Sequence, residues 1–120
     1  MKTATVAIGG KEYTACFSAY VIAKCEDRAG SVEKILEEVH SNKLSSALWL
    51  MAQMLKAGEL YKKINGGTPN KAPTYDELLV TTGLEDLNDV VFNTINETIT
   101  AGTSREVEVE PKNAETTQEE

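Results

Sequence analysis

Three side chains in this 120-residue sequence could support nucleophilic chemistry: Cys16, Cys25 and His40. A cysteine attacks a carbonyl carbon as the thiolate, and a neighbouring histidine is a common base for removing the thiol proton. Such a pair also needs a group that orients the imidazole and donors that stabilise the oxyanion. A thiol enzyme that uses Cys25 or Cys16 with His40 is therefore the remote alternative. We interpret both cysteines as small, half-buried apolar residues and His40 as a cation at the negative C-terminal end of a helix.

Motifs for phosphate or metal binding are incomplete. Ile8-Gly9-Gly10-Lys11 superficially resembles a glycine-rich phosphate loop, but it lacks the G-x-x-x-x-G-K-[ST] spacing and precedes a predicted strand. One histidine and two distant cysteines cannot supply a zinc ligand set, and no D-x-[DN]-x-[DN]-G calcium loop occurs. The sequence therefore predicts no catalytic, cofactor-binding or metal-binding residues, and a protein that is not an enzyme.

The charge balance limits the partners of the protein. The net charge is -7, from 12 basic and 19 acidic side chains. A phosphate backbone or an anionic membrane surface would repel such a protein, so we expect neither nucleic acid nor a membrane as partner. We expect no signal peptide, because no long apolar stretch follows Lys2, and no membrane span, because no run of about 18 apolar residues occurs. We expect a cytoplasmic protein whose cysteines stay reduced.

Residues 3–17 are predicted to form a β-hairpin. Two β-prone runs flank Gly9-Gly10, and two glycines suit a two-residue type I′ turn, which needs positive φ at both positions. Val6 and Ile8 would supply the apolar face of the hairpin. Because a lone hairpin is only marginally stable, it must pack on other elements.

Helical periodicity dominates the rest of the sequence. It predicts five helices, at residues 19–27, 32–39, 43–64, 75–81 and 83–100. Ser18 and Ser31 are candidate N-caps of the first two. Thr74 with Glu77, and Thr82 with Glu85, form capping boxes that open the last two. Gly58 lies inside the third helix at a cost in helix stability, so we interpret it as a point where another backbone packs closely.

The predicted fold is mainly α, with an N-terminal β-hairpin followed by about five helices. We expect a single domain over residues 1–102, in which a Gly/Pro-rich loop at 65–73 separates a C-terminal helical pair. Gly102 is expected to end the fold. Residues 103–120 carry six glutamates against two basic residues, so we expect a disordered acidic tail. Its 105–110 segment alternates like a strand, but with only two apolar residues we interpret it as coil.

The third predicted helix is apolar on nearly all sides and must be covered on several of them. A chain this short is expected to leave part of that surface for a second copy or a partner, and methionine-rich surfaces adapt to varied apolar partners. The alternative is that these side chains form the core. The candidate partner-binding residues, on parts of the helix expected to be exposed, are Leu48, Trp49, Met51, Met54, Leu55 and Tyr61.

Four segments together resemble a known family. They are Ile-Gly-Gly-Lys-Glu-Tyr at 8–13, Gly-Ser-Val-Glu-Lys-Ile-Leu-Glu at 30–37, Leu-Ser-Ser-Ala-Leu-Trp-Leu-Met-Ala-Gln-Met-Leu-Lys-Ala-Gly at 44–58 and Pro-Thr-Tyr-Asp-Glu-Leu-Leu at 73–79. In this order they resemble the tail assembly chaperones of long-tailed bacteriophages and of prophages in Gram-positive bacteria. The resemblance covers residues 5–100 and consists of hydrophobic pattern and turn placement, without a catalytic signature.

The resemblance implies a role in assembly. Members of this family bind the long tape-measure protein before the tail tube forms, keep that apolar helical filament soluble and help to recruit tail-tube protein. They act in the cytoplasm of the bacterial host, are absent from the mature virion and need no cofactor. The resemblance thus implies self-association into an oligomer and two partners, the tape-measure protein and the tail-tube protein. The alternative function is a helical adaptor or structural subunit of a phage or bacterial assembly, such as a head–tail connector component.

Overall fold

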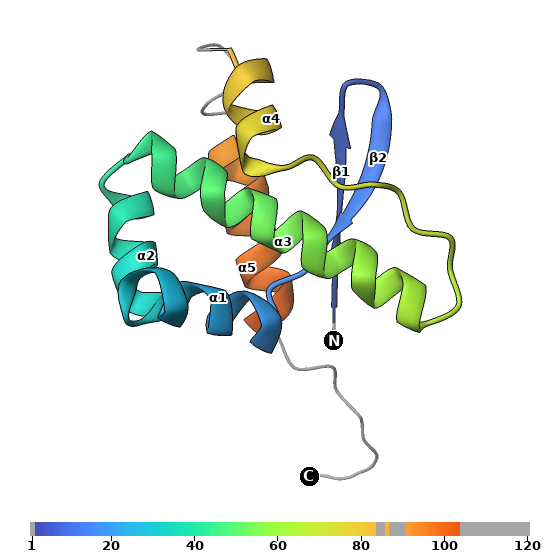
Figure 1. Ribbon diagram of the computed structural model, residues 1–120, viewed down its shortest axis with the longest axis horizontal. Helices are drawn as coiled ribbons and strands as arrows, with labels where there is room; N and C mark the ends of the chain where they lie inside the picture. The colour runs from blue at the N-terminus through green and yellow to red at the C-terminus, as the bar shows by residue number, and fades with distance from the viewer. Residues whose placement is uncertain (1, 84–85, 87–90, 104–120) are drawn as a thin grey trace, which may run out of the picture.

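A two-stranded hairpin precedes five helices in the part of the chain that the structure, a computed structural model, describes: residues 2–83, 86 and 91–103 (Figure 1). The predicted mainly helical fold with an N-terminal hairpin is confirmed. Helix α3 crosses the middle of the molecule, and the other elements surround it (Figure 1). The elements are β1 (Ala4–Ile8), β2 (Lys11–Ala15), α1 (Ala19–Ala29), α2 (Val32–His40), α3 (Leu44–Ile64), α4 (Tyr75–Thr81) and α5 (Asn93–Thr103).

The hairpin has the predicted turn. Gly9 and Gly10 have φ angles of 58° and 82°, which a glycine pair adopts without strain. The strands pair antiparallel, with Ile8 opposite Lys11 and Val6 opposite Tyr13. Val6 and Tyr13 are buried, whereas Ile8 is only half-buried. Alternation along the strands therefore directs one face of the hairpin toward the core and leaves the other in solvent.

Local capping chemistry fixes the starts of α2 and α4. The Ser31 hydroxyl accepts a hydrogen bond from the Lys34 amide at 3.1 Å, as predicted for the N-cap of α2. Thr74 and Glu77 form the predicted capping box of α4. Ser18 occupies the N-cap position of α1, but its side chain makes no capping hydrogen bond.

The C-terminal boundary differs from the prediction. Helix α5 continues through Gly102 to Thr103, three residues beyond the predicted helix end at residue 100. A Cβ at Gly102 would lie 2.7 Å from the carbonyl oxygen of Phe17, so glycine at this position permits close packing between α5 and the chain that follows β2. Glu85 of the predicted Thr82–Glu85 capping box lies outside the described residues, as do residues 104–120 of the acidic tail predicted at 103–120.

The hairpin docks on α3 through backbone contacts. The Cys16 amide donates a hydrogen bond to the Met54 carbonyl oxygen at 3.1 Å. One turn further on, a Cβ at Gly58 would overlap the carbonyl group of Thr14 and lie 2.7 Å from the Cα of Ala15. The predicted close approach of another backbone at Gly58 is confirmed. Two segments some forty residues apart in sequence therefore meet without an intervening side chain.

Candidate functional site

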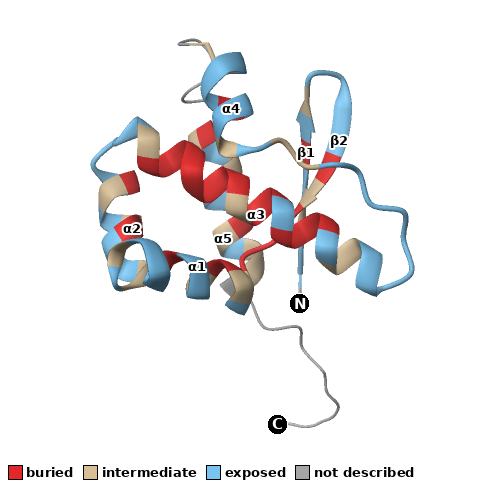
Figure 2. Ribbon diagram, in the orientation of Figure 1, coloured by how far each residue is buried: buried red, intermediate tan, exposed pale blue. Residues whose placement is uncertain are grey.

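Five of the six predicted partner-binding residues lie in the hydrophobic core. Leu48, Trp49, Met51, Met54 and Leu55 are at most 8% exposed, and Tyr61 is half-buried. The expectation that these residues lie on exposed parts of the helix is wrong for those five, because β2, α1, α2, α4 and α5 together cover α3 within one chain (Figure 2). A partner could reach these five side chains only if the fold opened.

Trp49 illustrates how the chain covers its own central helix. The guanidinium carbon of Arg28, at the end of α1, lies 4.7 Å from the centroid of the Trp49 ring and 5.8 Å from the centroid of the Tyr75 ring. A guanidinium over aromatic faces is attracted to them and shields them from water. Spacing along the sequence gives no sign of this arrangement, because the three residues come from three different helices.

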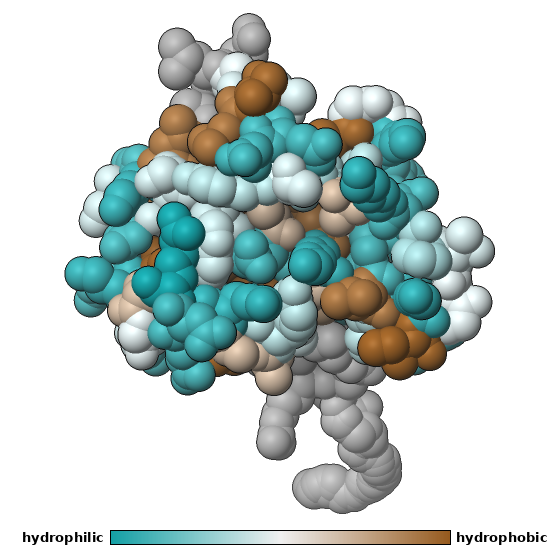
Figure 3. Space-filling model, in the orientation of Figure 1, coloured by the Kyte–Doolittle hydropathy of each residue, from teal (hydrophilic) through white to brown (hydrophobic). Residues whose placement is uncertain are grey.

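Five large apolar side chains are exposed in the described part of the chain: Leu44, 40% exposed at the start of α3, and two pairs. Leu60 and Ile64, which we call the α3-end patch, are 41% and 81% exposed. Leu79 and Val80, the α4 patch, are 40% and 85% exposed. The space-filling view shows brown apolar surface over the end of α3 and, separately, over α4 (Figure 3). The 60/64 pair shares one helix face by its i, i+4 spacing, which is visible in the sequence.

The two patches have neighbours of opposite charge. Lys63 lies beside the α3-end patch, in the last turn of α3, where a cation also interacts favourably with the helix dipole. Asp76 and Glu77 lie in the first turn of α4, next to the α4 patch. Exposed apolar side chains with charged neighbours are typical of protein-binding surfaces.

The two thiols lie in an environment that disfavours the thiolate. Burial raises the pKa of Cys16 by more than the Ser18 hydroxyl lowers it. Burial, with a smaller contribution from the Glu26 carboxylate, raises the pKa of Cys25 to about 11. His40 is exposed at the end of α2 and contributes to neither shift. The structure thus brings both cysteines into the core and leaves the histidine at the surface.

Thiol labelling tests this arrangement. At pH 7 we expect both cysteines of the native protein to react with a disulfide reagent at least about a hundredfold more slowly than in denaturant, since reaction requires the thiolate and access to it. The variant His40→Ala should label at the wild-type rate. Fast native labelling that disappears in His40→Ala would instead revive the thiol enzyme.

A cleft of about 790 Å³ opens between the hairpin turn, residues 71–73 and α4. Its charged lining residues, Lys11, Lys71, Glu77 and Asp86, balance one another, and Tyr13 and Leu78 are among its apolar ones. Among the described residues the lining contains no cysteine or histidine. Nor does the described part of the chain contain a cluster of three His, Cys, Asp or Glu residues that could hold a metal ion.

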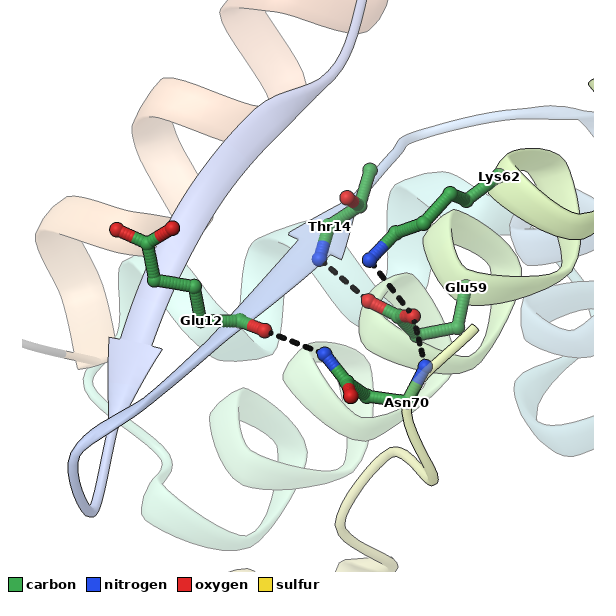
Figure 4. A network of polar contacts seen from close by, with 5 residues as sticks. All are labelled: Glu12, Thr14, Glu59, Lys62 and Asn70. Carbon is green, nitrogen blue, oxygen red and sulfur yellow. Dashed lines mark hydrogen bonds and ion pairs between the residues drawn. The ribbon is translucent and has the colours of Figure 1, made fainter. Parts of the chain in front are cut away.

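One buried carboxylate organises the junction between the hairpin and the helices (Figure 4). Glu59, on α3, is 4% exposed. Its Oε2 accepts a hydrogen bond from the Thr14 amide at 2.6 Å, and its Oε1 accepts one from the Asn70 amide at 2.7 Å. The Lys62 ammonium lies 3.1 Å from Oε1. The Asn70 side-chain amide completes the network by donating to the Glu12 carbonyl oxygen at 2.9 Å.

The network keeps Glu59 ionised and holds three segments together. Burial alone would raise the pKa of Glu59, but the Thr14 and Asn70 amides and the Lys62 ammonium offset it, so the pKa lies below the ordinary value of 4.5. Both oxygens are engaged by the chain itself. We therefore assign this carboxylate to the cohesion of β2, α3 and the 65–73 loop, not to a reaction.

Comparison of the chain with protein-family models, with curated proteins and with solved structures finds no match. Within the described residues, no helix is both long enough and apolar enough to cross a membrane.

Proposed function

We propose that this protein is a tail assembly chaperone, which binds the apolar tape-measure protein of a long-tailed phage or prophage and promotes assembly of the tail tube without catalysis. The observation that carries the proposal is the exposure of Leu60, Ile64, Leu79 and Val80 on a chain that buries most apolar side chains of its central helix. The segment resemblance over residues 5–100 supports it.

The physical basis is the free energy of burying these side chains. Apolar side chains exposed to water are unfavourable. When an apolar helix docks on them, the binding free energy gains about 25 cal/mol for each Å² of apolar surface that is buried. The two patches offer separate points of attachment along a filament, and several weak contacts on one chain add up to firm binding. The net charge of -7 on each copy would keep the tape-measure protein, once coated, from aggregating, because the coated filaments repel one another.

Under this proposal the protein acts in the cytoplasm of the bacterial host and is absent from the mature virion. Its partners are the tape-measure protein, tail-tube protein and further copies of itself. Binding requires no cofactor.

Co-expression with the tape-measure protein encoded beside it tests the proposal. We expect the tape-measure protein to stay soluble with the wild-type chain and to precipitate without it. Ile64→Glu should weaken binding by about tenfold to a hundredfold, because burying one aliphatic side chain contributes about 1.5–3 kcal/mol. Affinity is measured by titration of a tape-measure fragment.

Lys34→Glu is the matched control. It introduces the same side chain at an exposed position on α2, a helix that carries neither patch, and we expect it to bind like wild type. Equal precipitation of the tape-measure protein with and without the chain would refute the chaperone function. The helical adaptor would then be favoured, and a gene neighbourhood without tail-tube and tape-measure genes would point the same way.

A further inference from the structure

The exposed face of the second half of α3 combines aliphatic and basic side chains. From residue 56 to the end of the helix, the exposed positions are Lys56, Leu60, Lys63 and Ile64. Their i, i+3 and i, i+4 spacing places them on one stripe, which includes the α3-end patch (Figure 3). Neither lysine has an ion-pair partner in the described part of the chain, and Glu59, the acidic residue of this half of the helix, is buried. On a chain with net charge -7, the stripe is therefore a basic and apolar surface.

The C-terminal part of the sequence contains a segment of complementary character. Residues 105–110 read Arg-Glu-Val-Glu-Val-Glu and lie outside the described residues. Three glutamates and one arginine give the segment a net charge of -2. In an extended chain Val107 and Val109 share one face and are about 6.6 Å apart. Leu60 and Ile64 are about 6 Å apart along their helix. The two aliphatic pairs therefore match in spacing, and the charges of the two surfaces are opposite.

The end of α5 lies within reach of the stripe. A Cβ at Gly102 would lie 2.7 Å from the carbonyl oxygen of Phe17. The preceding residue, Cys16, is bonded through its amide to Met54 in the middle of α3. From there Leu60 is about 9 Å further along the helix, whose diameter with side chains is about 10–12 Å. Six extended residues beyond the end of α5 span about 20 Å, which is enough to pass around α3 and reach this position.

We propose that residues 105–110 dock in extended form on this stripe of the same chain, with Val107 and Val109 against the α3-end patch and the glutamates beside the two lysines. Two valines cannot form a core by themselves, but an apolar surface that already exists can bury them. Exposed ion pairs contribute little affinity, so the charges select and orient the segment while the aliphatic side chains supply most of the binding. The occupant is the chain's own segment, because a short linker holds it at an effective concentration in the mM range.

The docked segment would regulate the patch, and this consequence alone rests on the proposed function. The segment covers Leu60 and Ile64, so a tape-measure helix must displace it before it can bind there. The apparent affinity for that helix is then reduced in proportion to the fraction of molecules in which the stripe is free. The tail would thus keep the patch covered until an apolar partner competes for it.

NOE measurements between methyl groups of the full chain test the docking. We expect cross-peaks from Val107 or Val109 to Leu60 or Ile64. A sample mixed from two differently labelled batches separates contacts within one copy from contacts between copies. Cross-peaks that arise only between copies would overturn the proposal in favour of an exchange of segments, and the absence of cross-peaks would overturn it outright.

The double substitution Val107→Ser with Val109→Ser tests the regulation. We expect it to remove the contact and to strengthen tape-measure binding at least about twofold, the gain for a stripe that the segment occupies half of the time. Thr116→Ser with Thr117→Ser introduces the same side chains outside the segment and should bind like wild type. An unchanged affinity of the valine variant would overturn the regulation.

The docking and the chaperone function can fail separately. If the cross-peaks are present but Ile64→Glu leaves tape-measure binding unchanged, the docking stands and the patch is not the site of tape-measure binding. If the cross-peaks are absent and Ile64→Glu weakens that binding, the docking fails alone.

Discussion

Replacing Gly58 with alanine should lower the free energy of unfolding by about 3 kcal/mol, the upper end of the cost of overpacking a core. The added methyl group would overlap the Thr14 carbonyl and crowd the Cα of Ala15. These are backbone atoms, so no rotamer change can make room, and the hairpin must move away from α3. That movement would also stretch the hydrogen bond from the Cys16 amide to Met54. Urea unfolding of the two proteins measures the difference.

The sign of this effect is informative. Alanine has a higher helix propensity than glycine, by about 1 kcal/mol, so in a helix without the close contact the same substitution would stabilise the protein. Lys56→Ala, at an exposed position two residues earlier, is the control and should change stability by less than about 0.5 kcal/mol. A Gly58→Ala protein as stable as wild type, or more so, would mean that β2 does not pack against α3 at this point.

Features governed by local chemistry could be predicted from the sequence. The turn at Gly9-Gly10, the cap at Ser31 and the capping box at Thr74 each depend on a few neighbouring residues, and the structure has all three. Gly58 could also be predicted, because a glycine in the middle of an apolar helix needs a packing reason.

The burial of α3 could not be judged in the same way. Apolar residues all round a helix show that it must be covered, but not whether its own chain or a partner covers it. Which of the two covers α3 depends on how β2, α1, α2, α4 and α5 pack around it. It also depends on contacts between residues far apart in sequence, such as Arg28 over Trp49. The candidate residues at 48–55 were therefore misplaced, and the exposed pairs at 60/64 and 79/80 were missed although the spacing of Leu60 and Ile64 was visible.

Glu59 was missed for a related reason. An acidic residue among apolar ones, three positions before a lysine, is a signal that the sequence does contain. What it lacks is any sign that the partners are the backbone amides of Thr14 and Asn70, since every residue but proline has an amide. Sequence patterns indicate that a buried charge needs partners, but only the fold supplies their identity.

Replacing Glu59 with glutamine should lower the free energy of unfolding at pH 7 by about 2–4 kcal/mol, because hydrogen bonds to a charged group contribute more than neutral ones and their loss leaves buried donors unpaired. Glutamine has one accepting oxygen where the carboxylate has two. Its NH₂ group would face either the Thr14 amide or the Asn70 amide, donor against donor. Urea unfolding at pH 7 measures the loss.

Glu12→Gln is the matched control, because it makes the same chemical change on an exposed side chain of the same hairpin. It should alter stability by less than about 0.5 kcal/mol. The Asn70 hydrogen bond to Glu12 uses the backbone carbonyl oxygen and survives this change. Equal effects of the two substitutions would show that the buried network contributes nothing beyond an ordinary surface charge.

The pH dependence identifies the carboxylate as the source of the effect. Since the pKa of Glu59 is lower in the folded protein than its ordinary value of 4.5, its contribution is complete well above pH 4.5 and is lost as the pH falls through the folded pKa. The stability difference between wild type and Glu59→Gln should therefore be constant from pH 6 to 7 and shrink below about pH 4.5. Other carboxylates titrate equally in both proteins and cancel in this comparison. A difference that persists unchanged to pH 2 would assign the effect to packing and not to the ionised Glu59.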